Sequence, residues 1–142
     1  MKVKVMYYSK GGNTRKVAEA IAQALGQTAE AVPPAYPLEN VNVLFLGAAV
    51  YGGKIDPKMA EFIRTLNSSR VKNVALFGTC GGQDKALAEM KGLLKSQGIP
   101  VMDDTFLCKG KFFVFINRKH PNAEELKAAQ EFAKKVVGQV KE

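Results

Sequence analysis

The stretch Tyr8-Ser9-Lys10-Gly11-Gly12-Asn13-Thr14 lies between an apolar run, 3–7, and a segment whose apolar residues are spaced as in a helix, 17–25. A turn of glycine and hydroxyl residues at the start of a helix offers backbone N–H groups, O–H donors and the positive end of the helix dipole. A phosphate dianion binds to groups of this kind. The stretch therefore predicts a strand, a phosphate-binding loop and a helix in succession.

The rest of the chain continues to alternate strand-like apolar runs with segments of helical spacing. Gly26 and Gly98 are typical of helix C-termini, and Asp56-Pro57 supplies an N-cap and a proline for a first helical turn. Asn122, with Glu125 three residues later, predicts the start of a terminal helix. In order, the expected elements are strand 3–7, helix 17–25, strand 29–32, strand 41–46, helix 56–66, strand 74–77, helix 84–97, strand 100–107 and a helix from 122.

Five strands that alternate with helices predict an open parallel α/β sheet with helices on both faces. At 142 residues the chain is expected to form one domain, residues 1–142. Ligands of such sheets bind beyond the carboxyl ends of the strands, so we expect the site at the loops 9–14, 48–53 and 79–82. Glycine there permits positive φ angles and close approach of the backbone to a ligand. Seven of the 13 glycines lie in or beside these loops: Gly11, Gly12, Gly52, Gly53, Gly78, Gly81 and Gly82.

All three loops carry a resemblance to one family. Ser9-Lys10-Gly11-Gly12-Asn13-Thr14 resembles the phosphate loop of flavodoxins, which has a hydroxyl residue first, glycine fourth and threonine last. The segments 46–53 and 74–82 are similar to the second and third flavin loops of that family, in the same order. The resemblance covers nearly the whole chain and is to short-chain flavodoxins. It implies an open five-stranded sheet of order 2-1-3-4-5 and FMN as the cofactor.

The resemblance also implies which residues bind FMN. The hydroxyls of Ser9 and Thr14 are the strongest candidates at the phosphate, while Lys10 either contributes charge or is a solvated surface residue. Tyr51 either stacks on the flavin ring or packs as a rim aromatic, and the Gly52 peptide can turn over cheaply. No catalytic residue and no metal ligand are assigned. The implied cofactor-binding residues are Ser9, Lys10, Gly11, Gly12, Asn13, Thr14, Ala49, Val50, Tyr51, Gly52, Gly53, Thr79, Cys80, Gly81 and Gly82.

The chain departs from the family at the flavin ring. The third loop, 79–83, lacks the aromatic residue that often covers the outer flavin face, and Lys54 stands where many flavodoxins have an acid. Weaker FMN binding, or one flavin face left open to another reactant, is the expected consequence. The basic, phenylalanine-rich segment 108–121 either contributes to a docking surface or packs under the final helix.

The amino-acid composition limits which binding partners and which cellular compartment are expected. The 21 Lys and Arg residues exceed the 13 Asp and Glu residues, giving a net charge of +8. This charge favours a redox partner with an acidic docking surface, and peripheral contact with an anionic membrane stays open. A nucleic acid is not predicted, because no basic run is interleaved with aromatics. Two cysteines without metal spacing, and no apolar run long enough to span a membrane, predict a cytoplasmic protein.

Two functions of different class remain. The first is an FMN-binding electron carrier that passes electrons between redox partners. The alternative is a small flavodoxin-like FMN oxidoreductase that acts on a quinone or a porphyrinogen-type substrate, so whether the chain is an enzyme is left open. The physiological partner, the potentials, the oligomeric state and the role of 108–121 do not follow from the sequence.

Overall fold

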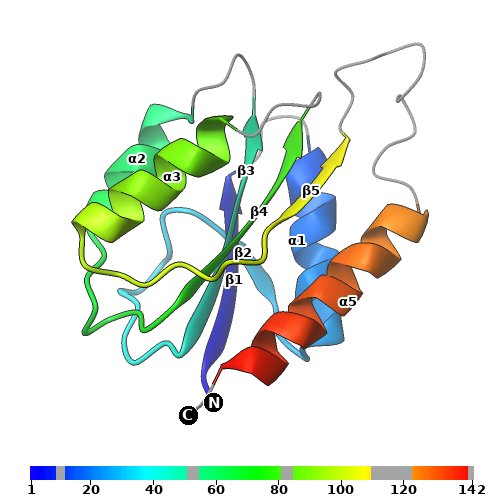
Figure 1. The fold of residues 1–142 in the computed structure, drawn as a ribbon, viewed down its shortest axis with the longest axis horizontal. Coiled ribbons are helices and arrows are strands. Elements are labelled where there is room, and N and C mark those ends of the chain that lie inside the picture. Colours follow the sequence, from blue (N-terminus) through cyan, green and yellow to red (C-terminus); the bar gives the residue numbers. More distant parts are fainter. Residues whose placement is uncertain (9–11, 51–54, 81–84, 110–122, 141–142) are drawn as a thin grey trace.

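The computed structural model has a five-stranded parallel sheet between two layers of helices (Figure 1). It describes residues 1–8, 12–50, 55–80, 85–109 and 123–140. The strand order is β2-β1-β3-β4-β5, which confirms the predicted fold and order. The strands are β1 (Val3–Tyr8), β2 (Ala29–Ala31), β3 (Val43–Val50), β4 (Val74–Cys80) and β5 (Phe106–Lys109).

Helices cover both faces of the sheet, as expected. The helices α1 (Asn13–Ala24) and α5 (Ala123–Gln139) pack on one face, and α2 (Pro57–Arg64) and α3 (Lys85–Ser96) pack on the other (Figure 1). The helix ends follow the local sequence signals. Gly26 and Gly98 adopt left-handed φ angles of 68° and 75° after α1 and α3. Asp56 is the N-cap of α2, where its side chain accepts a hydrogen bond from the Lys58 N–H at 2.9 Å.

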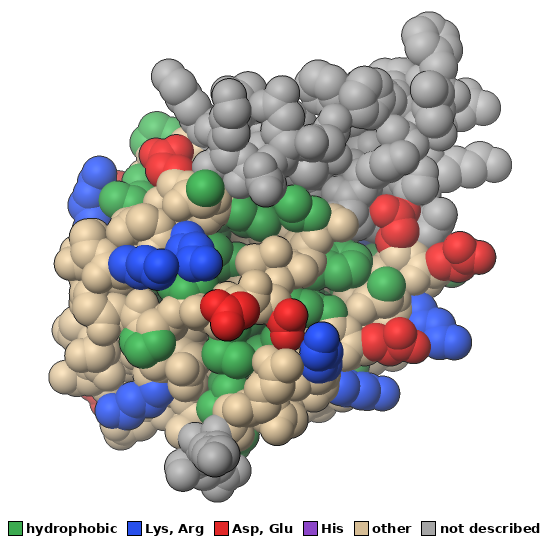
Figure 2. Space-filling model, in the orientation of Figure 1, with side chains coloured by type: hydrophobic (Ala, Val, Ile, Leu, Met, Phe, Trp, Pro, Cys, Tyr) green, Lys and Arg blue, Asp and Glu red, His purple; other side chains and the backbone are tan. Residues whose placement is uncertain are grey.

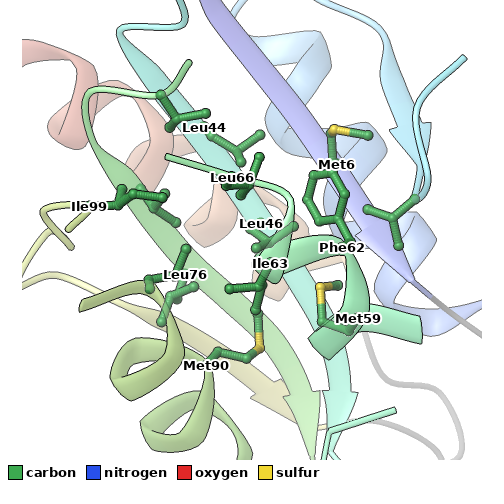
Figure 3. Packing of buried hydrophobic residues seen from close by; sticks show 14 of the residues in the cluster. Met6, Leu44, Leu46, Met59, Phe62, Ile63, Leu66, Leu76, Met90 and Ile99 are labelled. Atoms are coloured by element: carbon green, nitrogen blue, oxygen red, sulfur yellow. The ribbon is translucent and has the colours of Figure 1, made fainter. Parts of the chain in front are cut away.

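Each face of the sheet has its own hydrophobic core. The side chains of β3 alternate between the two cores: Leu44 and Leu46 face α2 and α3, whereas Val43 and Phe45 face α1 and α5. This double burial explains why the strand is a continuous apolar run rather than an alternating one. Figure 3 shows the core under α2 and α3 (Met6, Leu44, Leu46, Met59, Phe62, Ile63, Leu66, Leu76, Met90 and Ile99).

The connection from β2 to β3 crosses the sheet without a helix. Residues 32–42 contain Pro33, Pro34 and Pro37, whose rings restrict φ and remove backbone N–H donors. Val32, Leu38 and Val41 of this segment are buried in the core under α2 and α3. These three apolar side chains therefore take over part of the covering role that a crossover helix has elsewhere in the sheet.

The predicted fifth strand, 100–107, is placed too early. Val101 makes only an isolated bridge to Val74, and regular pairing begins at Phe106. Between them the chain turns toward α5, where Gln139 Nε2 donates to Asp104 Oδ2 at 3.1 Å and Lys135 Nζ lies 3.7 Å from the same oxygen. These polar contacts interrupt the strand.

Three other element ends differ from expectation. The strands β3 and β4 continue to Val50 and Cys80, farther than the predicted ends at 46 and 77. The helix α2 ends at Arg64 rather than near 66. The predicted N-cap at Asn122 lies outside the described residues.

Candidate functional site

The carboxyl ends of β1, β3 and β4 lie next to one another at a single edge of the sheet, the upper edge in Figure 1. The register pairs Tyr8 with Ala48, Ala48 with Gly78 and Val50 with Cys80. Each of the three predicted flavin loops leaves the sheet from one of these strand ends. Loops far apart in the sequence therefore begin side by side, as the parallel order requires. We call this part of the molecule the site edge.

Only part of the predicted site is described. The structure places Gly12, Asn13 and Thr14 at the start of α1. It places Ala49 and Val50 at the end of β3, and Thr79 and Cys80 at the end of β4. The last four were expected in loops but are paired strand residues, Ala49 with Thr79 and Val50 with Cys80. The remaining predicted site residues lie outside the described ranges: Ser9, Lys10, Gly11, Tyr51, Gly52, Gly53, Gly81 and Gly82.

Gly12 gives the site edge its first defined feature. It is the N-cap of α1 and has a left-handed φ of 84°, which L side chains rarely adopt. A Cβ added at this position would meet no atom within 4 Å. Glycine is therefore required here by backbone conformation rather than by crowding, and the open space beside it suits a ligand that approaches the first helical turn.

Thr14 is the buried polar side chain of the site edge. Its exposed fraction is 0%, and among the described residues it is the only polar or charged side chain in the buried class. Thr14 has an interaction partner within the protein, as expected because a buried hydroxyl without one is costly. The first turn of a helix has N–H groups with no acceptor inside the helix. A hydroxyl and these N–H groups together form a donor set suited to an anion.

Packing within the sheet, and not a ligand, explains why residue 78 is glycine. A Cβ at position 78 would lie 2.7 Å from the carbonyl oxygen of Ala48 on the neighbouring strand. Close pairing of β3 and β4 just below the site edge therefore requires glycine there. The sequence grouped Gly78 with the glycines of the third loop, whereas it lies within β4 and has this packing role.

Three helices that begin at the site edge have no acidic residue inside their first turn, although Asp56 caps α2. The first turns of α1, α2 and α3 contain no Asp or Glu, although acids are favoured there by the helix dipole. Instead the first turns of α1 and α2 carry Arg15 and Lys58. The helix α5 follows the usual preference, with Glu124 and Glu125 in its first turn. Basic side chains therefore stand in the first turns of α1 and α2, where Arg15 is paired with Glu19 and Asp56 caps the helix that carries Lys58.

Figure 2 shows a different charge pattern on the face that carries β5. Lys and Arg side chains are spread over this face rather than gathered in one patch, and acidic side chains lie over α5. The described residues of this face therefore form no continuous basic surface of the kind that follows a nucleic-acid backbone.

Two residues at the site edge were missed by sequence reasoning. Lys58 Nζ lies 6.0 Å from the centroid of the Tyr8 ring, which brings the start of α2 over the end of β1. Glu89 of α3 accepts a hydrogen bond from the Ile55 N–H at 3.4 Å, which ties the residue after the second loop to α3. The position of Lys58, directly after the helix-start signal Asp56-Pro57, could have indicated its place at the site edge. No residue near Glu89 in the sequence indicated its hydrogen bond with Ile55.

Two hollows lined by described residues lie away from the site edge. One, of about 460 Å³, lies beside Val101 and α5, and the other, of about 340 Å³, lies between the proline-rich crossover and the C-terminal end of α2. Both are toward the amino ends of the strands. They are therefore not parts of the candidate site.

Comparison with known proteins agrees with this geometry. A family model described as a flavodoxin domain matches residues 4–129. An uncharacterized protein of Methanocaldococcus jannaschii is 29% identical over 150 residues, covering 96% of this chain and 99% of the relative. The flavodoxin-like domain-containing protein BilS of Clostridioides difficile is 28% identical over 130 residues, covering 84% of this chain and 72% of BilS.

The solved structures give the same fold. The structure of a flavodoxin from the domain Archaea matches with a TM-score of 0.83 at 22% identity, and each chain is covered completely. At this identity the match speaks for the fold alone. In the described ranges, no helix combines the length and the apolar character needed to cross a membrane.

Proposed function

The chain belongs to the flavodoxin family, and on this premise we propose that it is an FMN-binding electron-transfer protein that passes electrons between redox partners. One observation carries the proposal: the register of β1, β3 and β4 makes the three loops begin at one sheet edge. Bound there, FMN would supply one- and two-electron redox chemistry. The residues of this chain would bind it, orient it and set the charge around it.

The described residues fit the phosphate end of FMN. Gly12 leaves open space beside the first turn of α1, and Thr14 places a hydroxyl in that turn. The segment Ser9 to Gly11 directly precedes them and would complete a set of backbone and side-chain donors. We therefore propose that residues 9–14 hold the phosphate, with Ser9 and Thr14 donating hydroxyl hydrogen bonds.

The ring end of FMN is proposed to lie against the second and third loops. These segments continue from Val50 and Cys80, whose backbones are paired in the sheet. In this arrangement β3 and β4 form the rigid base, and the peptide groups that follow them contact the isoalloxazine ring. The proposed contact residues here are Ala49, Val50, Tyr51, Gly52, Gly53, Thr79, Cys80, Gly81 and Gly82.

A redox partner with an acidic docking surface is proposed from the charge distribution. The chain carries a net charge of +8, and the first turns of α1, α2 and α3 contain no acid. Complementary charge steers association and fixes orientation, and its effect weakens with salt. We further propose that residues 1–142 act as a single domain in the cytoplasm, where both cysteines would stay reduced.

The second candidate is an FMN oxidoreductase that acts on a quinone or a porphyrinogen-type substrate. The observation that favours it is the absence of an aromatic residue from the sequence 79–83, because an uncovered flavin face would be accessible to a substrate. We rank it second because no acid/base pair is assigned to the site.

A turnover assay without any other protein separates the two functions. The FMN-loaded protein is mixed with NAD(P)H and a quinone, or with a porphyrinogen in air, and free FMN at the same concentration is the control. An electron carrier is expected to show no saturable turnover above free FMN. Saturable turnover with either substrate would contradict the carrier and support the oxidoreductase.

A further inference from the structure

Lys58 is an exposed lysine in the first turn of α2, and its ammonium nitrogen lies 6.0 Å from the centre of the Tyr8 ring. Tyr8 is the last residue of β1 and directly precedes the first loop, whereas α2 begins shortly after the second loop. A cation over an aromatic face is attracted by the ring. The contact therefore holds one positive charge between the chain segments that lead into two of the three loops.

Lys58 lies on the opposite face of the sheet from the proposed phosphate site. The Tyr8 side chain packs against the core under α2 and α3. Gly12 and Thr14 begin α1, which packs on the other face. The charge of Lys58 thus lies on the α2 side of the sheet, in the helix that follows the second loop, against which the flavin ring is proposed to lie.

The Asp56 carboxylate accepts a hydrogen bond from the backbone N–H of Lys58 at 2.9 Å, but the Lys58 ammonium is not ion-paired with a described carboxylate. In the part of the chain that the structure describes, no carboxylate forms an ion pair with Lys58, whereas Arg15 is paired with Glu19 at 3.3 Å. A cation at a helix N-terminus is disfavoured by the helix dipole. The dipole end of α2 is thus capped by the Asp56 carboxylate, and the Lys58 ammonium adds a positive charge that would stabilise a negative charge developing nearby.

We propose that Lys58 stabilises the reduced, negatively charged flavin ring relative to the oxidised, neutral ring, and so raises the reduction potential of bound FMN. This inference rests on the proposed function. Two electrons and one proton convert the oxidised ring to its monoanionic reduced form, and the electrons come from the redox partner. The added negative charge resides on the ring, whereas the phosphate carries the same charge before and after reduction. Lys58 acts through this difference.

The test compares FMN affinity in the two oxidation states for wild type, Lys58→Gln and Lys58→Arg. Fluorescence titration gives the dissociation constant of oxidised FMN, and dye-coupled reduction with dithionite gives the potential, from which the dissociation constant of reduced FMN follows. Lys72→Gln is the matched control, because Lys72 is also exposed and lies beyond the C-terminal end of α2, away from the site edge.

For Lys58→Gln, the dissociation constant of reduced FMN is expected to rise about fivefold more than that of oxidised FMN, the effect of one partly solvated charge. The difference should shrink at high ionic strength because Lys58 is exposed. Lys58→Arg and Lys72→Gln are expected to keep the wild-type ratio.

Equal weakening of both oxidation states would place Lys58 at the phosphate and overturn the inference. A ratio indistinguishable from that of Lys72→Gln would overturn it as well, with FMN binding itself intact. A wild-type protein that binds no FMN would instead refute the proposed function, and the inference would fail with it.

Discussion

Replacing Gly47 with alanine is expected to lower the free energy of unfolding by about 3 kcal/mol. Gly47 lies in β3 and is paired with Phe77 of β4. A Cβ at position 47 would overlap Cε2 and Cζ of the Phe77 ring and would lie 2.6 Å from its Cδ2. The ring is fully buried in the core under α1 and α5, so it has no free space into which it could turn. Urea denaturation of the purified variant measures the loss.

Two further variants separate this clash from a general effect of losing glycine. Gly92 lies inside α3, and a Cβ there would meet no atom within 4 Å, so Gly92→Ala should stabilise the protein by up to about 1 kcal/mol. In the double variant Gly47→Ala/Phe77→Leu, the loss should be at least about 1 kcal/mol smaller than the sum of the two single losses. A loss below about 1 kcal/mol for Gly47→Ala alone would contradict the packing described here.

Replacing Thr14 with valine is expected to raise the dissociation constant of FMN by between about 10-fold and 150-fold. This range corresponds to one hydrogen bond to a charged group, about 1.5 to 3 kcal/mol. Valine keeps the branched shape of threonine, so the buried site in the first turn of α1 stays filled while the hydroxyl is removed. Fluorescence titration of FMN with the purified apoprotein measures the change.

Thr65→Val is the matched control for this substitution. Thr65 is the C-cap of α2, and its hydroxyl donates to the Phe62 carbonyl oxygen at 2.6 Å, away from the site edge. Thr65→Val loses this hydrogen bond and should unfold at a slightly lower temperature. Only Thr14→Val should weaken FMN binding. An FMN affinity for Thr14→Val equal to that for Thr65→Val would show that the phosphate site has been misplaced.

The alternation of strands and helices was predictable because its signals are local, whereas the sheet order was inferred from the resemblance to flavodoxins. The residues 43–46 are all apolar, and this pattern follows directly from burial between two helical layers. Likewise, Asp56-Pro57 and Gly98 mark helix ends through their own backbone and side-chain chemistry. Features of this kind depend on a few neighbouring residues.

The missed features depend instead on contacts between distant segments. The fifth strand starts late because Asp104 is held by side chains of α5, about thirty residues further along the chain. The role of Gly78 follows from its distance to the Ala48 carbonyl oxygen on another strand. No periodicity in the sequence reports either contact.

The candidate site also has features that a local motif predicts and features that depend on contacts between distant segments. The glycine and hydroxyl residues of the first loop are a contiguous motif, and the structure places the described ones, Gly12 and Thr14, at the start of α1. Lys58 was not recognised because its proximity to Tyr8 arises from the packing of α2 over β1. The proposal of FMN as the cofactor therefore follows from the sequence, whereas the proposed role of Lys58 required the fold.

The binding of FMN at the site edge is tested most directly by titrating FMN and riboflavin separately with the wild-type apoprotein and following flavin fluorescence. The account predicts saturable binding of one FMN per chain, and weaker binding of riboflavin, because riboflavin lacks the phosphate that residues 9–14 are proposed to hold. Unchanged FMN fluorescence at saturating protein, or riboflavin binding as tight as that of FMN, would contradict it.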